Sequence, residues 1–120
     1  MEYRWVGKNI DINLAKSKIE EFLKEQNYKM ERSESPLSIT WRATLRQKNR
    51  TRQIMIIVTG GPDDFKINFR GGHGLDHLLK SSLITQFFGV AALLRDSYEA
   101  LDFYKQAEEK FWRKMEEALG

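Results

Sequence analysis

The two histidines of the chain, His73 and His77, lie four residues apart in a glycine-rich segment that follows Arg70. Free backbone amides after such a glycine loop, at the start of a helix, can bind an anion. The segment therefore has two interpretations: an anion- or ligand-binding loop, or the turn that leads the chain from a strand into a helix, which we prefer. The residues of this loop are Gly71, Gly72, His73, Gly74, Asp76 and His77.

Known catalytic and metal-binding patterns do not fit this loop. It lacks the Lys-Ser/Thr pair of a P-loop and the G-x-G-x-x-G spacing of a dinucleotide site. His73, Asp76 and His77 could offer three metal ligands, but no H-E-x-x-H pattern accompanies them. The chain has no cysteine, which excludes disulfides, zinc fingers and a cysteine nucleophile. We expect no catalytic residue, no metal and no cofactor.

The positive net charge is concentrated in the middle of the chain. The formal net charge is only +3, yet the segment from Ser35 to Pro62 contains no acid and five bases, and the strand predicted next adds Lys66 and Arg70. Such a segment suits a polyanion, because each phosphate that a Lys or Arg neutralises releases condensed counterions. A solvated sheet face is the plainer interpretation. The candidate nucleic-acid-binding residues are Arg42, Arg46, Lys48, Arg50, Arg52, Lys66 and Arg70.

The elements that would position these residues follow from hydrophobic periodicity. Asp11 can cap a helix over 12–26, and Asp96 with Glu99 resembles a capping box at the start of a last helix. A further helix is expected over 75–94. Alternating apolar and polar residues predict strands at 2–9, 28–33, 37–48, 52–59 and 64–70.

Two turns predict how the strands pair. A two-residue turn at 49–50 would set Leu45 opposite Ile54, and a four-residue turn at 60–63 would set Val58 opposite Phe65. Both registers gather the apolar residues on one face, with Arg42, Arg46, Lys66 and Arg70 on the other. Met55 and Ile57 fall on the basic face. The predicted apolar face consists of Leu37, Ile39, Trp41, Ala43, Leu45, Ile54, Ile56, Val58, Phe65, Ile67 and Phe69.

We therefore expect residues 1–120 to form a single α+β domain of two layers, with helices on one face of an antiparallel four- or five-stranded sheet. The element order β-α-β-β-β-β-α-α resembles one half-repeat of the TATA-binding protein fold and a shortened helix-grip domain. The resemblance lies in element order only, and no residue role is transferred from it. A helix-grip resemblance implies an apolar ligand pocket between helix and sheet, here lined by Trp41, Phe65, Phe69, Phe87 and Phe88.

These patterns predict a cytoplasmic, non-enzymatic binding or assembly domain that acts through its basic outer sheet face. The partner would be nucleic acid, bound through its backbone, or an acidic protein. No membrane association is expected, because no apolar run approaches ~20 residues. The alternative is a small-molecule-binding, helix-grip-like domain or an enzyme with its site at the Gly71–His77 loop. A homodimer is also expected, covering either Phe111, Trp112 and Met115 or the apolar residues of the outer face. If the last helix instead folds back over the sheet, it would itself bury Phe111, Trp112 and Met115, and these residues would no longer favour a dimer.

Overall fold

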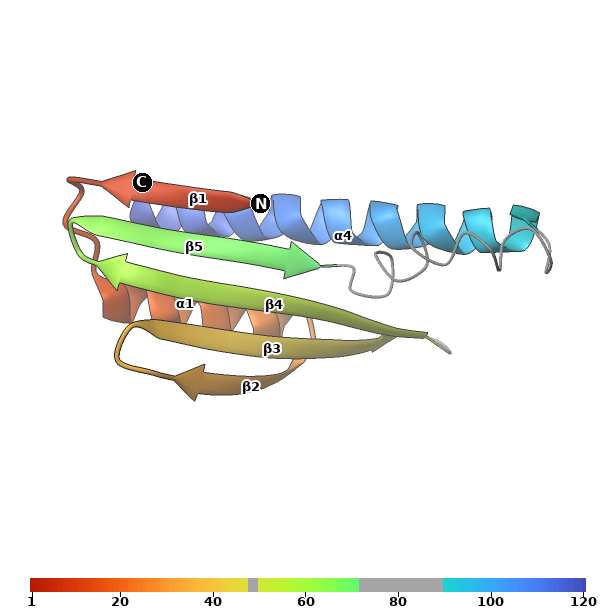
Figure 1. Cartoon of the computed structure of the whole chain (residues 1–120), viewed down its shortest axis with the longest axis horizontal. Helices are drawn as coiled ribbons and strands as arrows, with labels where there is room; N and C mark the ends of the chain where they lie inside the picture. Colours follow the sequence, from red (N-terminus) through yellow and green to blue (C-terminus); the bar gives the residue numbers. More distant parts are fainter. Residues whose placement is uncertain (48–49, 72–89) are drawn as a thin grey trace.

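The computed structural model describes residues 1–47, 50–71 and 90–120, and the side chains of the last helix from Glu99 onward. Five antiparallel strands form one sheet in the order β1-β5-β4-β3-β2. Both described helices, α1 and α4, lie on the same side of it (Figure 1). This confirms the two-layer α+β architecture. The elements are β1 (Glu2–Val6), α1 (Ile12–Glu25), β2 (Lys29–Glu34), β3 (Ser38–Gln47), β4 (Arg50–Gly61), β5 (Asp64–Gly71) and α4 (Val90–Leu119).

Helix α1 carries the chain from β1 at one edge of the sheet to β2 at the other. It begins where expected, because the Asp11 carboxylate accepts a hydrogen bond from the Leu14 amide at 3.2 Å. It ends at Glu25, since Asn27 adopts a left-handed conformation with φ of 65°. Between these ends, one face of the helix is buried at Ala15, Ile19, Phe22 and Leu23.

The pairing of β3 with β4 differs from the prediction by two residues. Ala43 lies opposite Ile54, and Gln47 lies opposite Arg50, so residues 48–49 connect the two strands instead of the predicted 49–50. Side chains alternate between faces with a period of two, so an even shift leaves every side chain on its predicted face. The predicted apolar face therefore survives an incorrect register.

The turn between β4 and β5 is also tighter than predicted. Gly61 pairs with Asp64, which leaves only Pro62 and Asp63 in the turn. Gly60 has φ of 91°, and a side chain there would overlap the Asp64 carbonyl. The register again shifts by two residues, so the face assignment holds.

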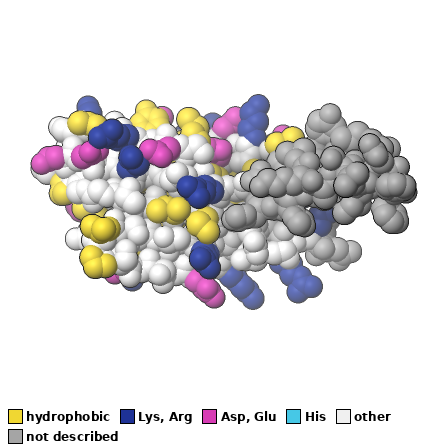
Figure 2. Space-filling model, viewed as in Figure 1, with side chains coloured by type: hydrophobic (Ala, Val, Ile, Leu, Met, Phe, Trp, Pro, Cys, Tyr) yellow, Lys and Arg dark blue, Asp and Glu magenta, His cyan; other side chains and the backbone are white. Residues whose placement is uncertain are grey.

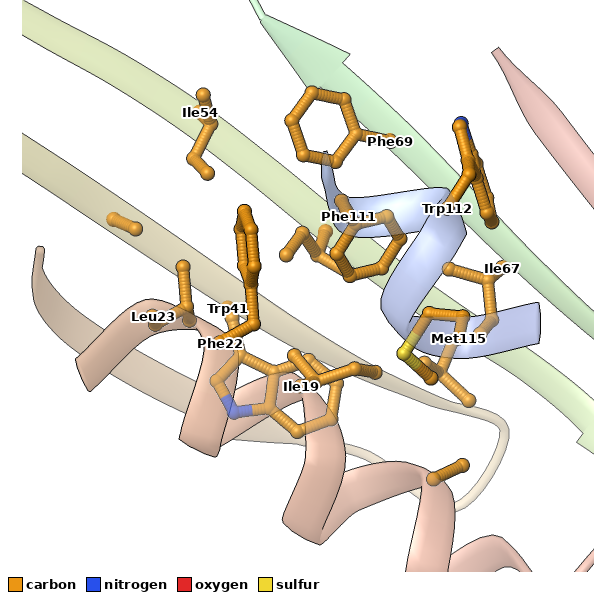
Figure 3. Packing of buried hydrophobic residues seen from close by; sticks show 14 of the residues in the cluster. Ile19, Phe22, Leu23, Trp41, Ile54, Ile67, Phe69, Phe111, Trp112 and Met115 are labelled. Atoms are coloured by element: carbon orange, nitrogen blue, oxygen red, sulfur yellow. The ribbon is translucent and has the colours of Figure 1, made fainter. Parts of the chain in front are cut away.

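The core lies between the sheet and the two helices (Figure 3). The sheet contributes Trp41 and Phe69, α1 contributes Phe22, and α4 contributes Phe111 and Met115, all at most 2% exposed. Leu37, predicted to join them, is 85% exposed. It lies in a turn closed by the Ser35 amide donating to the Ser38 carbonyl at 2.8 Å, ahead of the strand.

The last helix corrects a further prediction. The capping box at Asp96 and Glu99 is wrong, because α4 runs without a break from Val90 to Leu119. No proline or glycine lies within this range, so nothing in the backbone chemistry interrupts the helix. The predicted helix at 75–94 lies mostly outside the described residues.

Interhelical ion pairs accompany the burial of α4 beside α1. The Lys114 ammonium lies 3.1 Å from a Glu21 carboxylate oxygen and 3.0 Å from one of Glu25. Hydrogen bonds from Lys114 and Lys18 lower the pKa of Glu21, although this group is exposed. In the described part of the chain, neither helix is long and apolar enough to cross a membrane.

Candidate nucleic-acid interface

The sheet face opposite α1 and α4, here called the outer face, carries four of the seven predicted binding residues. Arg42 lies opposite Met55, and Met55 lies opposite Arg70, so these three side chains form one row across the sheet. Two strand spacings separate the Arg42 and Arg70 Cα atoms by about 10 Å. Arg46 and Lys66 occupy the same face at other positions. The polar side chains predicted between them are also there: Thr40, Thr44, Gln53, Thr59 and Asn68.

The other predicted binding residues are elsewhere. Arg50 and Arg52 are even-numbered residues of β4 and share the helix-covered face with Ile54. The Arg50 guanidinium lies 2.8 Å from a Glu99 carboxylate oxygen on α4. The Arg52 guanidinium lies 5.6 Å from the centre of the Phe103 ring. Lys48 lies outside the described residues.

The edge strands bring acids to the outer face that the sequence analysis did not place there. Arg4 on β1 donates two hydrogen bonds to Asp64, at 2.8 and 2.7 Å. The Arg4 guanidinium lowers the pKa of the Asp64 carboxyl, and Lys66 lies 3.4 Å from Glu2. The end of the outer face nearest the β4–β5 turn is therefore close to neutral.

Four bases of the outer face have no such partner. We call Lys29, Arg42, Arg46 and Arg70 the basic quartet. Within the described residues, no carboxylate lies within 4.0 Å of their charged nitrogens. Glu31 lies opposite Arg42 in the β2–β3 register without forming an ion pair. The end of the face nearest residues 48–49 is therefore positively charged.

An open depression of about 760 Å³ lies over β2, β3 and β4 on this side, and Lys29, Glu31, Arg42 and Met55 line it. Met55 and Ile57 are half-buried here although no described helix covers them. Figure 2 shows hydrophobic atoms on this face among basic and acidic side chains. The outer face thus offers cations around an apolar strip.

Only the first residue of the predicted glycine loop is described. Gly71 ends β5, and its backbone packs so closely on Tyr104 that a Cβ would lie 2.6 Å from the ring atom Cδ1. The remaining loop residues, which include both histidines and Asp76, lie outside the described part. In that part, no group of three His, Cys, Asp or Glu residues could hold a metal.

Three of the five aromatic residues of the alternative ligand pocket are packed in the core. Trp41, Phe65 and Phe69 are at most 1% exposed, and the Phe69 ring centre lies 5.1 Å from that of Phe111. Phe87 and Phe88, the other predicted lining residues, lie outside the described residues.

The described residues also bear on self-association. Phe111, Trp112 and Met115 are at most 8% exposed inside one copy of the chain. The last helix therefore folds back over the sheet, and these residues give no reason for a dimer. Dimerisation through Met55 and Ile57 stays a prediction.

Comparisons of the chain with protein-family models, with curated proteins and with solved structures find no match.

Proposed function

We propose that this protein is a non-enzymatic binding domain whose outer face holds the phosphate backbone of a nucleic-acid duplex. The observation that supports this most directly is the basic quartet, four cations without a carboxylate partner in the described residues, gathered at one end of a sheet face that neither described helix covers. Counterion release on binding phosphates would supply the free energy. Neutral donors such as Thr44 and Gln53 lie between the cations and can reach phosphate oxygens.

A duplex fits this face better than a single strand. Proteins that hold single strands stack bases on exposed rings. The described rings of the strands, such as Trp5, Trp41 and Phe69, are on the helix-covered face. Recognition would therefore use the backbone and tolerate many base sequences.

The test is fluorescence anisotropy of a labelled duplex of about 20 base pairs, titrated between about 50 and 200 mM salt. Four phosphate contacts predict a slope of log K against log salt near −3.6. The double substitution Arg42→Glu and Arg70→Glu should abolish binding. The control, Lys24→Glu with Lys105→Glu, makes the same charge change on exposed positions of the helix layer and should leave substantial binding.

A second pair of variants separates local from total charge. Glu31→Gln removes the acid opposite Arg42 and should tighten duplex binding, whereas Glu116→Gln on α4 should not. Equal effects of these two variants would show that only net charge matters. No binding at 50 mM salt, or binding of polyglutamate with none of the duplex, would overturn the proposal, the latter in favour of an acidic protein partner.

A further inference from the structure

A second hollow lies on the helix side of the molecule, and none of its lining residues belongs to the outer face. It has a volume of about 360 Å³ and lies between the end of α1, the end of β3 and the middle of α4. Its apolar wall consists of Phe22, Tyr28, Leu45, Phe103 and Ala107. Its polar rim consists of Gln26, Asn27, Gln47, Gln106 and Lys110.

The apolar wall is well desolvated. Phe22, Tyr28 and Ala107 are at most 8% exposed, and Leu45 and Phe103 are half-buried. Burial raises the pKa of the Tyr28 hydroxyl to about 12. The apolar wall therefore includes three aromatic rings, of which the Phe103 ring keeps the most accessible surface.

The polar groups of the rim favour an anion. Within the described residues, no carboxylate pairs with the Lys110 ammonium. Gln106 donates its amide to the Asp102 carboxylate at 3.1 Å, and Asp102 is not among the residues that line this hollow. Gln47 adds a further amide at the opposite wall of the hollow.

An adjoining hollow of about 720 Å³ shares Gln47, Phe103 and Gln106 with this one. Arg52 lines it together with Arg50, Glu99 and Asp102. The Arg52 guanidinium lies over the Phe103 ring, and its buried Nε atom has no hydrogen-bond partner within the described residues. From Phe103 to Lys110, α4 rises by about 10 Å. A ligand lying along this stretch would have a cation near each end.

We propose that this hollow binds a small aromatic carboxylate, its ring against Tyr28, Leu45 and Phe103 and its carboxylate at Lys110. Small-molecule sites are concave and about 300–1,000 Å³ in volume, with an apolar lining and polar groups that fix orientation. The hollow has a volume in this range, five of its ten lining residues are apolar, and its one charged lining residue is a cation. The site involves none of the outer-face residues, so its test is independent of the test for duplex binding.

The test uses 1-naphthoate and its neutral analogue 1-naphthalenemethanol, titrated into the full chain by isothermal calorimetry. Wild-type protein should bind 1-naphthoate more tightly. Lys110→Gln should weaken 1-naphthoate by about 10-fold, equivalent to about 1.4 kcal/mol, and leave the alcohol unchanged. The matched control is Lys105→Gln, an exposed lysine of the same helix outside the hollow, which should change neither.

A filling variant tests the location. Ala107→Leu should abolish binding of both compounds with a retained cooperative melting transition, and if it fails to fold, Gln47→Trp at the rim tests the same space. Absence of saturable 1-naphthoate binding, equal effects of Lys105→Gln and Lys110→Gln, or a preference for the alcohol would each overturn the proposal.

Discussion

Replacing Phe111 with alanine tests the packing of α4 on the sheet. The ring is fully buried, and its centre lies 5.3 Å from that of Phe22 on α1 and 5.1 Å from that of Phe69 on β5. Phe→Ala in a core costs about 3–5 kcal/mol. Since the neighbours belong to different elements and cannot close the space easily, we expect about 4 kcal/mol. At an m-value near 2 kcal/mol/M, the urea midpoint would fall by about 2 M.

The assay is equilibrium urea unfolding followed by tryptophan fluorescence and circular dichroism. Leu101→Ala on the same helix is the control, because Leu101 is 48% exposed and should cost less than about 1 kcal/mol. A cost below about 1 kcal/mol for Phe111→Ala would refute this packing. A wild-type midpoint that rises with protein concentration, and loses that dependence in Phe111→Ala, would instead place the ring between two copies.

Three further changes probe individual contacts. Gly71→Ala should destabilise the folded chain by about 1–3 kcal/mol in thermal unfolding, because the new Cβ would meet the Tyr104 ring. The Tyr104 hydroxyl accepts a hydrogen bond from the backbone amide of Gln53 at 3.2 Å, which holds the ring in place. The same change in a Tyr104→Ala background should have no such effect. Trp41→Phe loses ring volume and the indole hydrogen bond to Glu20 at 3.2 Å, and should cost about 1–3 kcal/mol in urea unfolding. Tyr28 keeps its proton to a pKa of about 12 in the folded chain but titrates near 10 when unfolded, so above pH 10 the unfolded state binds fewer protons and stability falls. Melting temperatures from pH 9 to 12 should decline more steeply for wild type than for Tyr28→Phe, and equal slopes would contradict the buried hydroxyl.

The faces of the central strands could be predicted from the sequence, but their registers could not. Alternation repeats every two residues, so a slip of two residues leaves the pattern unchanged. Ala43 opposite Ile54 and Ala43 opposite Ile56 look equally good on hydrophobicity alone. Only the position and length of a turn distinguish such registers. Residues 48–49 connect β3 and β4 one position earlier than the predicted turn, and the Pro62-Asp63 turn between β4 and β5 is two residues shorter than predicted.

The candidate site was only partly predictable for a related reason. Arg50 and Arg52 have the parity of Ile54, so the alternation along β4 indicates that they face the helices, although the run of bases in the hairpin predicts one shared binding surface. No local pattern could reveal that Glu2 reaches the outer face, because β1 pairs with β5, far along the chain. Glu31 reaches the outer face through the pairing of β2 with the next strand, β3.

The edge strands limit what the outer face can hold. With the β4–β5 end neutralised, the basic quartet covers about 13 Å along β3, from Arg42 to Arg46, and about 14 Å across the sheet, from Arg70 to Lys29. Since duplex DNA rises 3.4 Å per base pair, this patch spans about four base pairs. Such a footprint suits non-specific binding with dissociation constants of about 10⁻⁴–10⁻⁶ M at physiological salt. Much tighter binding would require cations or contacts beyond this patch, because four phosphate contacts alone do not supply the additional free energy.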